Sequence, residues 1–244
     1  MDNSARMPVF PAIEPDRVTF DCPYFNDGRQ TSLELFPVNR ETGREFHGLL
    51  AAGCRRMGEL FYRNVCAGCR SCVSLRVEVA KFVPSKSQRR TLRKSSRLTV
   101  LERVYHRRDP RITTDKLNLY VKYIKTKHTN EDSMPVNELL HLHHGYSHIR
   151  ELHFLDGEKL IGVSVLDEAR DALSSNYFYY DTDYLPVRPG VFSILKDIEF
   201  AASLGKRFYY LGFYIADLPK MSYKKHFRPN QVLDGGEWKE FTGE

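Results

Sequence analysis

No stretch of this 244-residue chain approaches the roughly 20 consecutive apolar residues that a membrane-spanning helix needs. The N-terminus also lacks the apolar core of about 7–15 residues that a secretion signal carries, so we expect a cytoplasmic protein that contacts no membrane. The chain has only five cysteines, and a reducing compartment disfavours structural disulfides. We therefore interpret the cysteines as free thiols, metal ligands or packing residues.

Two nucleotide-binding signatures are missing as well. The chain has no P-loop motif and no glycine-rich loop of the kind that holds the pyrophosphate of coenzyme A. What is present is the composition of a folded globular protein, with 41% hydrophobic and 28% charged residues and a net charge of +6. A net positive charge is compatible with a nucleic-acid partner. The clustering of basic residues along the chain is stronger evidence than the net charge itself.

The apolar spacing predicts an α+β protein. Residues 1–20 read as irregular, and the first half otherwise predicts helices and strands at 42–53, 59–62, 73–79, 98–105 and 115–127. The second half opens with a hairpin around Asp156-Gly157, formed by 149–155 and 159–166. Strand, helix, strand, short helix and short strand then follow at 173–180, 191–204, 207–215, 221–227 and 231–233.

This order of elements is typical of a GNAT-type acyltransferase. We expect an N-terminal cysteine-containing α/β region packed on a GNAT-like acyltransferase domain with a mixed, mainly antiparallel sheet. A polar loop at residues 130–135 is the candidate boundary, which predicts an N-terminal domain at 1–130 and a C-terminal domain at 131–244.

Three cysteines, Cys66, Cys69 and Cys72, recur at consecutive three-residue steps before a predicted strand. Thiolates are soft ligands for zinc and for iron–sulfur clusters, and a tetrahedral site needs four donors, for which Cys22 is the candidate fourth. The same small thiols could equally pack a tight turn without metal, and both interpretations stay open.

A basic run follows the cysteines, with six basic residues and no acid between Lys86 and Arg97. Arg89, Arg93 and Arg97 recur every four residues, so a helix beginning near Ser87, with Ser87 as its cap, would place them on one face. Such a row suits phosphate groups, although a basic face that contacts only water is the alternative. The candidate phosphate-binding residues are Lys86, Ser87, Gln88, Arg89, Arg90 and Arg93.

Four motifs occur in order along the chain. They are segment 53–62, the three-cysteine motif, segment 82–90 with its Ser-Gln-Arg-Arg, and segment 209–224 with Tyr-Leu-Gly-Phe-Tyr and Lys-Met-x-Tyr-Lys. Together they resemble the arginyl-tRNA–protein transferase family over about residues 22–238. The length and the cysteine motif are similar to its compact bacterial branch, the aspartate/glutamate leucyltransferases.

The resemblance implies a reaction. Leucine from leucyl-tRNA, or arginine in the longer branch, is joined to the α-amine of a protein that begins with Asp or Glu, which marks that protein for N-degron degradation. The aminoacyl ester is already activated, so no cofactor is required, and positioning is expected to supply much of the rate. The implied partners are aminoacyl-tRNA and acidic N-termini, with no DNA.

The resemblance also indicates site residues. Asp181, Asp183 and Tyr180 are the expected catalytic residues, where a carboxylate would orient or deprotonate the amine. The alternative is that Asp181 only begins a turn or caps the next segment. The expected acceptor- and aminoacyl-binding residues are Arg55, Arg56, Tyr62, Arg76, Tyr214, Lys220, Tyr223 and Lys224.

Other interpretations stay open beside this one. The histidines at 141, 143, 144 and 148 look like a metal patch, but a partly exposed helix face explains them better. A non-catalytic RNA-binding module with a zinc knuckle would explain the cysteines and the basic run. An ordinary coenzyme A-dependent acyltransferase would explain the order of elements, but the missing pyrophosphate loop argues against it.

Overall fold

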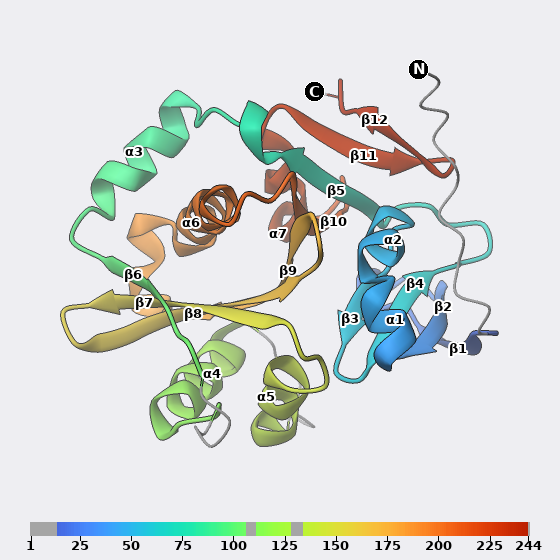
Figure 1. Cartoon of the computed structure of the whole chain (residues 1–244), viewed down its shortest axis with the longest axis horizontal. Coiled ribbons are helices and arrows are strands. Elements are labelled where there is room, and N and C mark those ends of the chain that lie inside the picture. Colours follow the sequence, from blue (N-terminus) through green and yellow to red (C-terminus); the bar gives the residue numbers. More distant parts are fainter. Residues whose placement is uncertain (1–13, 106–110, 128–133, 244) are drawn as a thin grey trace.

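The computed structural model describes residues 14–105, 111–127 and 134–243, and it contains two β-sheets (Figure 1). The smaller sheet is antiparallel and has the strand order β1-β2-β4-β3. Its strands are β1 Asp16–Asp21, β2 Gln30–Pro37, β3 Arg55–Met57 and β4 Leu60–Asn64. Two short helices, α1 Arg40–Arg44 and α2 Phe46–Ala51, connect β2 to β3, and Phe46 of α2 stacks on Phe61 of β4 at 4.6 Å between ring centroids.

The larger sheet has eight strands in the order β12-β11-β5-β10-β9-β8-β7-β6. Only the β9–β10 pair in this order is parallel, and its other neighbouring pairs are antiparallel, so the expected mixed, mainly antiparallel sheet is confirmed. The strands are β5 Val73–Glu78, β6 Thr99–Glu102, β7 Ile149–Asp156, β8 Lys159–Glu168, β9 Ala172–Tyr180, β10 Phe208–Tyr214, β11 Asn230–Asp234 and β12 Glu237–Glu240.

Helices cover both faces of this sheet. Figure 1 shows α3 and α6 on one side of β7–β9 and α4 and α5 on the other. The longer helices are α3 Lys86–Lys94, α4 Thr114–Lys127, α5 Pro135–His143 and α6 Pro189–Ser203. The short helices are η1 Val79–Lys81, η2 Thr182–Val187, α7 Pro219–Ser222 and η3 Tyr223–His226.

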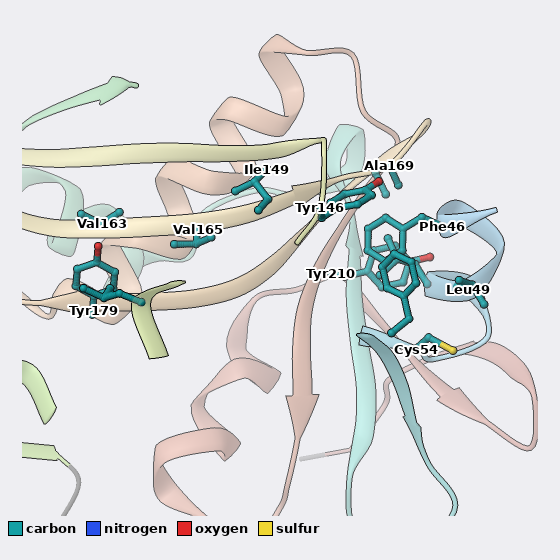
Figure 2. Close-up of a cluster of buried hydrophobic side chains, with 14 of the residues drawn as sticks. Phe46, Leu49, Cys54, Tyr146, Ile149, Val163, Val165, Ala169, Tyr179 and Tyr210 are labelled. Atoms are coloured by element: carbon teal, nitrogen blue, oxygen red, sulfur yellow. The ribbon is translucent and has the colours of Figure 1, made fainter. Parts of the chain in front are cut away.

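The hydrophobic core has one cluster on each face of the sheet. Under α6, Phe192 and Leu195 pack with Leu173 and Tyr209 of the strands. The other cluster runs from Phe46 and Leu49 of α2, through Tyr146 and Tyr210, to Val163 and Tyr179, as Figure 2 shows. Because this second cluster spans both sheets, the small sheet is held against the large one by a shared apolar core.

Most expected elements are confirmed, above all the order hairpin, strand, helix, strand in the second half. Three expectations are wrong: residues 16–20 form part of β1, the helix expected at 42–53 is divided into α1 and α2, and the cap of α3 is Ser85 instead of Ser87. The boundary expected near residue 130 lies outside the described residues, and the division into two domains stays a prediction.

A buried ionic cluster fixes α4 and α5 to β7. The Glu151 carboxylate accepts hydrogen bonds from Lys116, Tyr105, His143 and His153. Burial would raise the pKa of Glu151, but the hydrogen bonds from the two histidines and the charge of Lys116 outweigh burial and hold that pKa well below its usual range. His143 is therefore a buried structural residue, whereas His141, His144 and His148 are exposed.

Replacing Lys116 with methionine tests this cluster. The side chains of Lys116 and Glu151 are both 0% exposed, so the variant leaves a buried carboxylate without its ammonium partner. We expect the free energy of unfolding in urea to fall by about 3–5 kcal/mol. The matched control is Lys125→Met, at an exposed position near the end of the same helix, which should change it by less than about 0.5 kcal/mol. Equal effects would contradict the structural role.

Candidate active site

Strands β9 and β10 pair over three residues and then part. The pairs are Phe208–Ala172, Tyr209–Leu173 and Tyr210–Ser174, and β10 has a register shift between Tyr210 and Gly212. We call the region beyond these pairs, between residues 175–180 of β9 and 211–214 of β10, the wedge. At its base, Arg55, Ser174, Tyr210 and Gly212 line a cavity of about 10 Å³, which has room for about one water molecule.

Two backbone carbonyls in the wedge accept hydrogen bonds from cationic side chains. Arg55 Nη2 donates to the Ser175 carbonyl, and Lys224 Nζ donates to the Phe213 carbonyl at 3.0 Å. Backbone carbonyls must be paired where water is scarce, so the parting of the strands creates positions that side-chain donors fill. As a result, Arg55 and Lys224, which are far apart in the sequence, both lie at the wedge.

The backbone makes room for Arg55 at Gly212. This glycine has a φ of 84°, and a Cβ added there would lie 2.5 Å from Arg55 Nη1. A side chain at position 212 would therefore both strain the backbone and displace the guanidinium. Arg55 also lies 5.6 Å from the ring centroid of Phe213, so this turn of β10 orients the cation.

The two cations of the wedge have no acidic partner in the part of the chain that the structure describes. Burial, and then the charge of Arg55, lower the pKa of Lys224 to about 7. Lys224 is therefore partly neutral near pH 7, while Arg55 stays charged. The wedge is therefore electropositive, with no carboxylate among the described residues paired to either cation.

Tyrosines line the wedge. Tyr62 contacts Phe213 edge-on at 6.3 Å between ring centroids, and Tyr180 contacts Tyr123 of α4 at 5.1 Å. Burial raises the pKa of Tyr223 to about 12, and the charges of Tyr180 and Asp197 add to that shift. A Cβ on Gly190 would lie 3.6 Å from Tyr223 Oη, so this hydroxyl lies beside the first turn of α6.

The structure thus brings together five of the expected site residues at the wedge. Arg55, Tyr62, Tyr180, Tyr223 and Lys224 are half-buried at the wedge. Tyr214 is buried against Phe241 at 5.1 Å between ring centroids, and Lys220 is exposed on α7.

Arg56 and Arg76 are occupied by structural contacts. Arg56 is 4% exposed, pairs with Asp167 at 2.8 Å, and donates to the carbonyls of residues 141, 142 and 144 at the end of α5. Arg76 donates to Gln231 and Tyr210, and its guanidinium lies 3.8 Å from the ring centroid of Phe208. Of the three arginines expected to bind a carboxylate, Arg55 alone lies at the wedge.

Asp181 holds the end of β9 in place. Its carboxylate caps η2 by accepting from the Asp183 amide at 3.1 Å, and it pairs with Lys122 of α4 and with Lys159 of β8. Burial raises the pKa of Asp181, but the hydrogen bonds from both lysines outweigh burial and hold it at about 2. A carboxylate of that pKa is a weak base, so the contacts favour orientation over proton transfer. Asp183 is exposed and also pairs with Lys122, at 2.6 Å.

One buried acid next to the wedge was not expected. Asp197 of α6 accepts from Tyr209 at 2.8 Å and from Ser164 at 3.0 Å, while its Oδ1 has no partner among the described residues. Burial raises the pKa of Asp197 to about 7, although both hydrogen bonds oppose that shift. The sequence signal is an acid on the apolar, core-facing side of a helix, between Ile194 and Ile198.

The basic helix α3 adjoins the same site. Its capping box joins Ser85 to Gln88, whose side chain is buried and whose Nε2 donates to the His226 carbonyl at 3.0 Å. Arg188, before α6, donates to Ser87 Oγ at 3.0 Å. The other expected phosphate-binding residues, Lys86, Ser87, Arg89, Arg90 and Arg93, are exposed. Arg97 lies beyond the helix and pairs with Asp156, so the expected row of three arginines is shortened to two.

The cysteine cluster does not have the geometry of a metal site. Among the described residues, no three of His, Cys, Asp and Glu are arranged to hold a metal ion. Cys69 accepts a hydrogen bond from Arg29 and donates one to Ser71. Burial raises the pKa of the Cys72 thiol to about 12, with the charges of its neighbouring cysteines adding to the shift. The zinc or iron–sulfur site that we kept open at Cys22, Cys66, Cys69 and Cys72 does not fit this arrangement.

Comparison with known proteins identifies the family. The N- and C-terminal models of the arginine-tRNA-protein transferase family match residues 20–90 and 115–234. The aspartate/glutamate leucyltransferase of Stenotrophomonas maltophilia (strain R551-3) is 35% identical over 232 residues, which cover 91% of this chain and 90% of that protein. The chain belongs to the arginine-tRNA–protein transferase family, as the four motifs predicted.

Further relatives place it within the family. The aspartate/glutamate leucyltransferase of Saccharophagus degradans is 32% identical over 226 residues, covering 90% of this chain and 93% of that protein. Because the matches extend over almost the full length of such bacterial relatives, the chain lies in the compact bacterial branch.

Two solved structures are similar at a lower level. The C-terminal domain of a putative lysylphosphatidylglycerol synthetase from Agrobacterium fabrum has a TM-score of 0.48 and 12% identity, covering 79% of this chain and 57% of that one. The structure of FemX has a TM-score of 0.44 and 11% identity, covering 78% and 65%. No helix among the described residues is both long and apolar enough to cross a membrane.

The ion pairs of Asp181 predict an acid-dependent loss of stability. Its pKa of about 2 in the folded chain lies below the ordinary value of 3.8, so its contribution to stability is complete above about pH 4 and is lost as the pH falls toward 2. We expect Asp181→Asn to lower the free energy of unfolding at pH 6, and the deficit relative to the unsubstituted protein to shrink below pH 4. Urea unfolding at several pH values measures this.

Asp183→Asn is the matched control for Asp181, because the Asp183 side chain is 70% exposed. It should cost less at every pH. A deficit for Asp181→Asn that stays constant between pH 6 and pH 2.5 would show that the ion pairs of Asp181 do not stabilise the fold.

Proposed function

We propose that the chain transfers leucine from leucyl-tRNA to the α-amine of proteins that begin with Asp or Glu, in the cytoplasm, and so marks them for N-degron degradation. The observation that carries this proposal is the pair of cations at the wedge, Arg55 and Lys224, beside which the described residues place no carboxylate. Family membership supports the aminoacyl-tRNA donor, and the names of the relatives support leucine and the acidic acceptor.

Arg55 is the proposed contact of the acceptor's first side chain. A guanidinium can bind a carboxylate through two parallel hydrogen bonds, and the half-buried setting strengthens that pairing. An amide in place of the carboxylate would leave the cation desolvated without a counter-charge. The site should therefore reject Asn and Gln at the first position of the acceptor.

The tRNA is proposed to lie along α3, with its charged 3′ end at the wedge. The exposed basic residues of α3 suit the phosphates, and Gln88 connects this helix to the segment that carries Tyr223 and Lys224. The rings of Tyr180 and Tyr223 offer surfaces for the terminal base or the leucyl side chain. Asp181 and Asp183 are proposed to orient Tyr180 and the end of β9 at this point.

Transfer of radiolabelled leucine to short peptides tests the function. We expect transfer from leucyl-tRNA to peptides that begin with Asp or Glu, and little to matched peptides that begin with Asn or Gln. Arg55→Gln should lower kcat/KM for the Asp peptide by about 10- to 100-fold, because a hydrogen bond to a charged group contributes about 1.5–3 kcal/mol. Arg17→Gln, at an exposed position of β1, is the matched control.

Each outcome of the transfer assay has a meaning. An absence of transfer to the acidic peptides, with the charged tRNA shown to be intact, would refute the proposed function. Transfer from arginyl-tRNA alone would retain the family and reject leucine as the donor. Binding of tRNA whether charged or not, without any transfer, would favour a non-catalytic RNA-binding module.

The role of α3 is tested by its salt dependence. Arg89→Glu combined with Arg90→Glu should weaken tRNA binding and lower the slope of log Kd against log salt by about 2, since each lost phosphate contact removes about one unit. The control combines Arg44→Glu with Arg170→Glu, two exposed positions, which changes the same charge elsewhere on the surface. An unchanged slope in the Arg89/Arg90 variant would refute the phosphate contacts.

A further inference from the structure

The proposed reaction moves a proton as well as an aminoacyl group. The attacking α-amine must lose one proton when it forms the amide, and the departing ribose oxygen must gain one. Of the two carboxylates expected to act as the base, Asp181 already binds two ammonium groups and has a pKa of about 2, and Asp183 is exposed and pairs with Lys122. Asp197 is 1% exposed and is held in the core by Tyr209 and Ser164, so the wedge needs another group that can accept a proton.

We propose that the side-chain amine of Lys224 accepts the proton of the attacking α-amine and passes it to the departing ribose oxygen. This inference rests on the proposed function and adds a catalytic residue to it. It follows from where Lys224 lies, from the hydrogen bond that fixes it, and from the charged group that faces it.

The position of Lys224 is fixed by the backbone of the parting strand. Its Nζ donates to the Phe213 carbonyl at 3.0 Å, which uses one of the hydrogens of the amine and leaves the rest of the nitrogen for a substrate. The side chain is half-buried, at the point where β10 has left β9. A group held this way needs little reorganisation when a substrate arrives.

The surroundings of Lys224 favour the neutral amine. The charged group that faces it is the Arg55 guanidinium, and no carboxylate is paired with it in the described part of the chain. Burial and this like charge hold the pKa of Lys224 at about 7, against an ordinary value of 10.5. Near neutral pH a large fraction is therefore able to accept a proton, as a general base requires.

The position of Arg55 also explains why an acidic acceptor is suitable. The side-chain carboxylate and the α-amine of an N-terminal Asp or Glu are only a few bonds apart. Binding the carboxylate at Arg55 therefore places the α-amine in the same wedge as Lys224. Arg55 binds the side-chain carboxylate of the acceptor, and Lys224 removes a proton from its α-amine. Substrate selection and catalysis therefore depend on neighbouring groups.

The proposed reaction is balanced in atoms and protons without any further reactant. The neutral α-amine attacks the ester carbonyl carbon, and the new C–N bond forms as Lys224 takes a proton from the nitrogen and becomes an ammonium. The C–O bond to the ribose then breaks, and the ammonium returns that proton to the ribose oxygen. Both substrate atoms are bonded to the same carbon in the tetrahedral intermediate, so one group reaches both, and Lys224 ends neutral as it began.

The decisive variant is Lys224→Arg. Arginine keeps a cation and a donor for the Phe213 carbonyl, but it has no neutral form at the pH of the assay. With preformed complexes of enzyme, leucyl-tRNA and an Asp-initiated peptide, we expect the single-turnover rate to fall by about 10²- to 10⁴-fold. The Kd for leucyl-tRNA and the KM for the peptide should change little. Lys239→Arg, at an exposed position of β12, should retain the full rate.

A second variant separates proton transfer from structure. Lys224→Ala should regain part of its rate when small primary amines are added, and the regained rate should rise with the pKa of the added amine, as general-base catalysis requires. A residue that only holds the fold would not be replaced in this graded way. The thermal unfolding midpoint of each variant is measured alongside.

The outcomes distinguish this inference from the proposed function. If the unsubstituted protein transfers leucine and Lys224→Arg keeps its single-turnover rate, the inference is wrong and the function stands. A raised peptide KM with an unchanged rate, or an Ala variant that no amine restores, would also overturn it in favour of a binding or structural role. An absence of transfer by the unsubstituted protein overturns both together.

Discussion

The parting of β9 and β10 after the Ser174–Tyr210 pair is the constraint on which the site depends. A parallel pair that continued would satisfy its own carbonyls and leave no opening. Because it stops, the carbonyls of Ser175 and Phe213 take donors from Arg55 and Lys224, which come from opposite ends of the sequence. The need to pair buried backbone groups is thus what gathers the cations, and the chemistry proposed for them is a consequence of sheet geometry.

The sequence predicted the fold better in its second half than in its first. Strong local signals, such as Asp156-Gly157 and the apolar spacing of α6, predict the hairpin and the helix that the structure contains. Strand β3 is only three residues long and β1 is exposed along its whole length, so neither carries a burial pattern that a sequence can reveal. The cap of α3 was misplaced because Ser85 and Ser87 are chemically equivalent, and only the reciprocal bond to Gln88 distinguishes them.

The sequence predicts which residue types the site contains. It does not predict which of them lie at the wedge and which make structural contacts. Arg55 and Arg56 are adjacent, and the alternation of a strand sends one into the wedge and the other to Asp167 and the end of α5. Because β3 is not among the elements that the sequence predicts, the opposite directions of Arg55 and Arg56 could not be predicted either. Lys224 is a similar case, because its low pKa results from burial and from Arg55, a residue far away along the chain. Long-range electrostatics of this kind leaves no local pattern.

The place of β5 in the large sheet has a consequence for how the chain is made. Its neighbours are β10 and β11, which are synthesised long after it, so a growing chain carries β5 with both of its hydrogen-bonding edges open until translation is almost complete. Open edges invite pairing with other chains, and contacts between distant segments form slowly. Leu75 and Val77 are fully buried in the folded chain, and their strand neighbours on both sides belong to β10 and β11. We therefore expect a truncation that removes β11 to leave one edge of β5 unpaired and to promote aggregation.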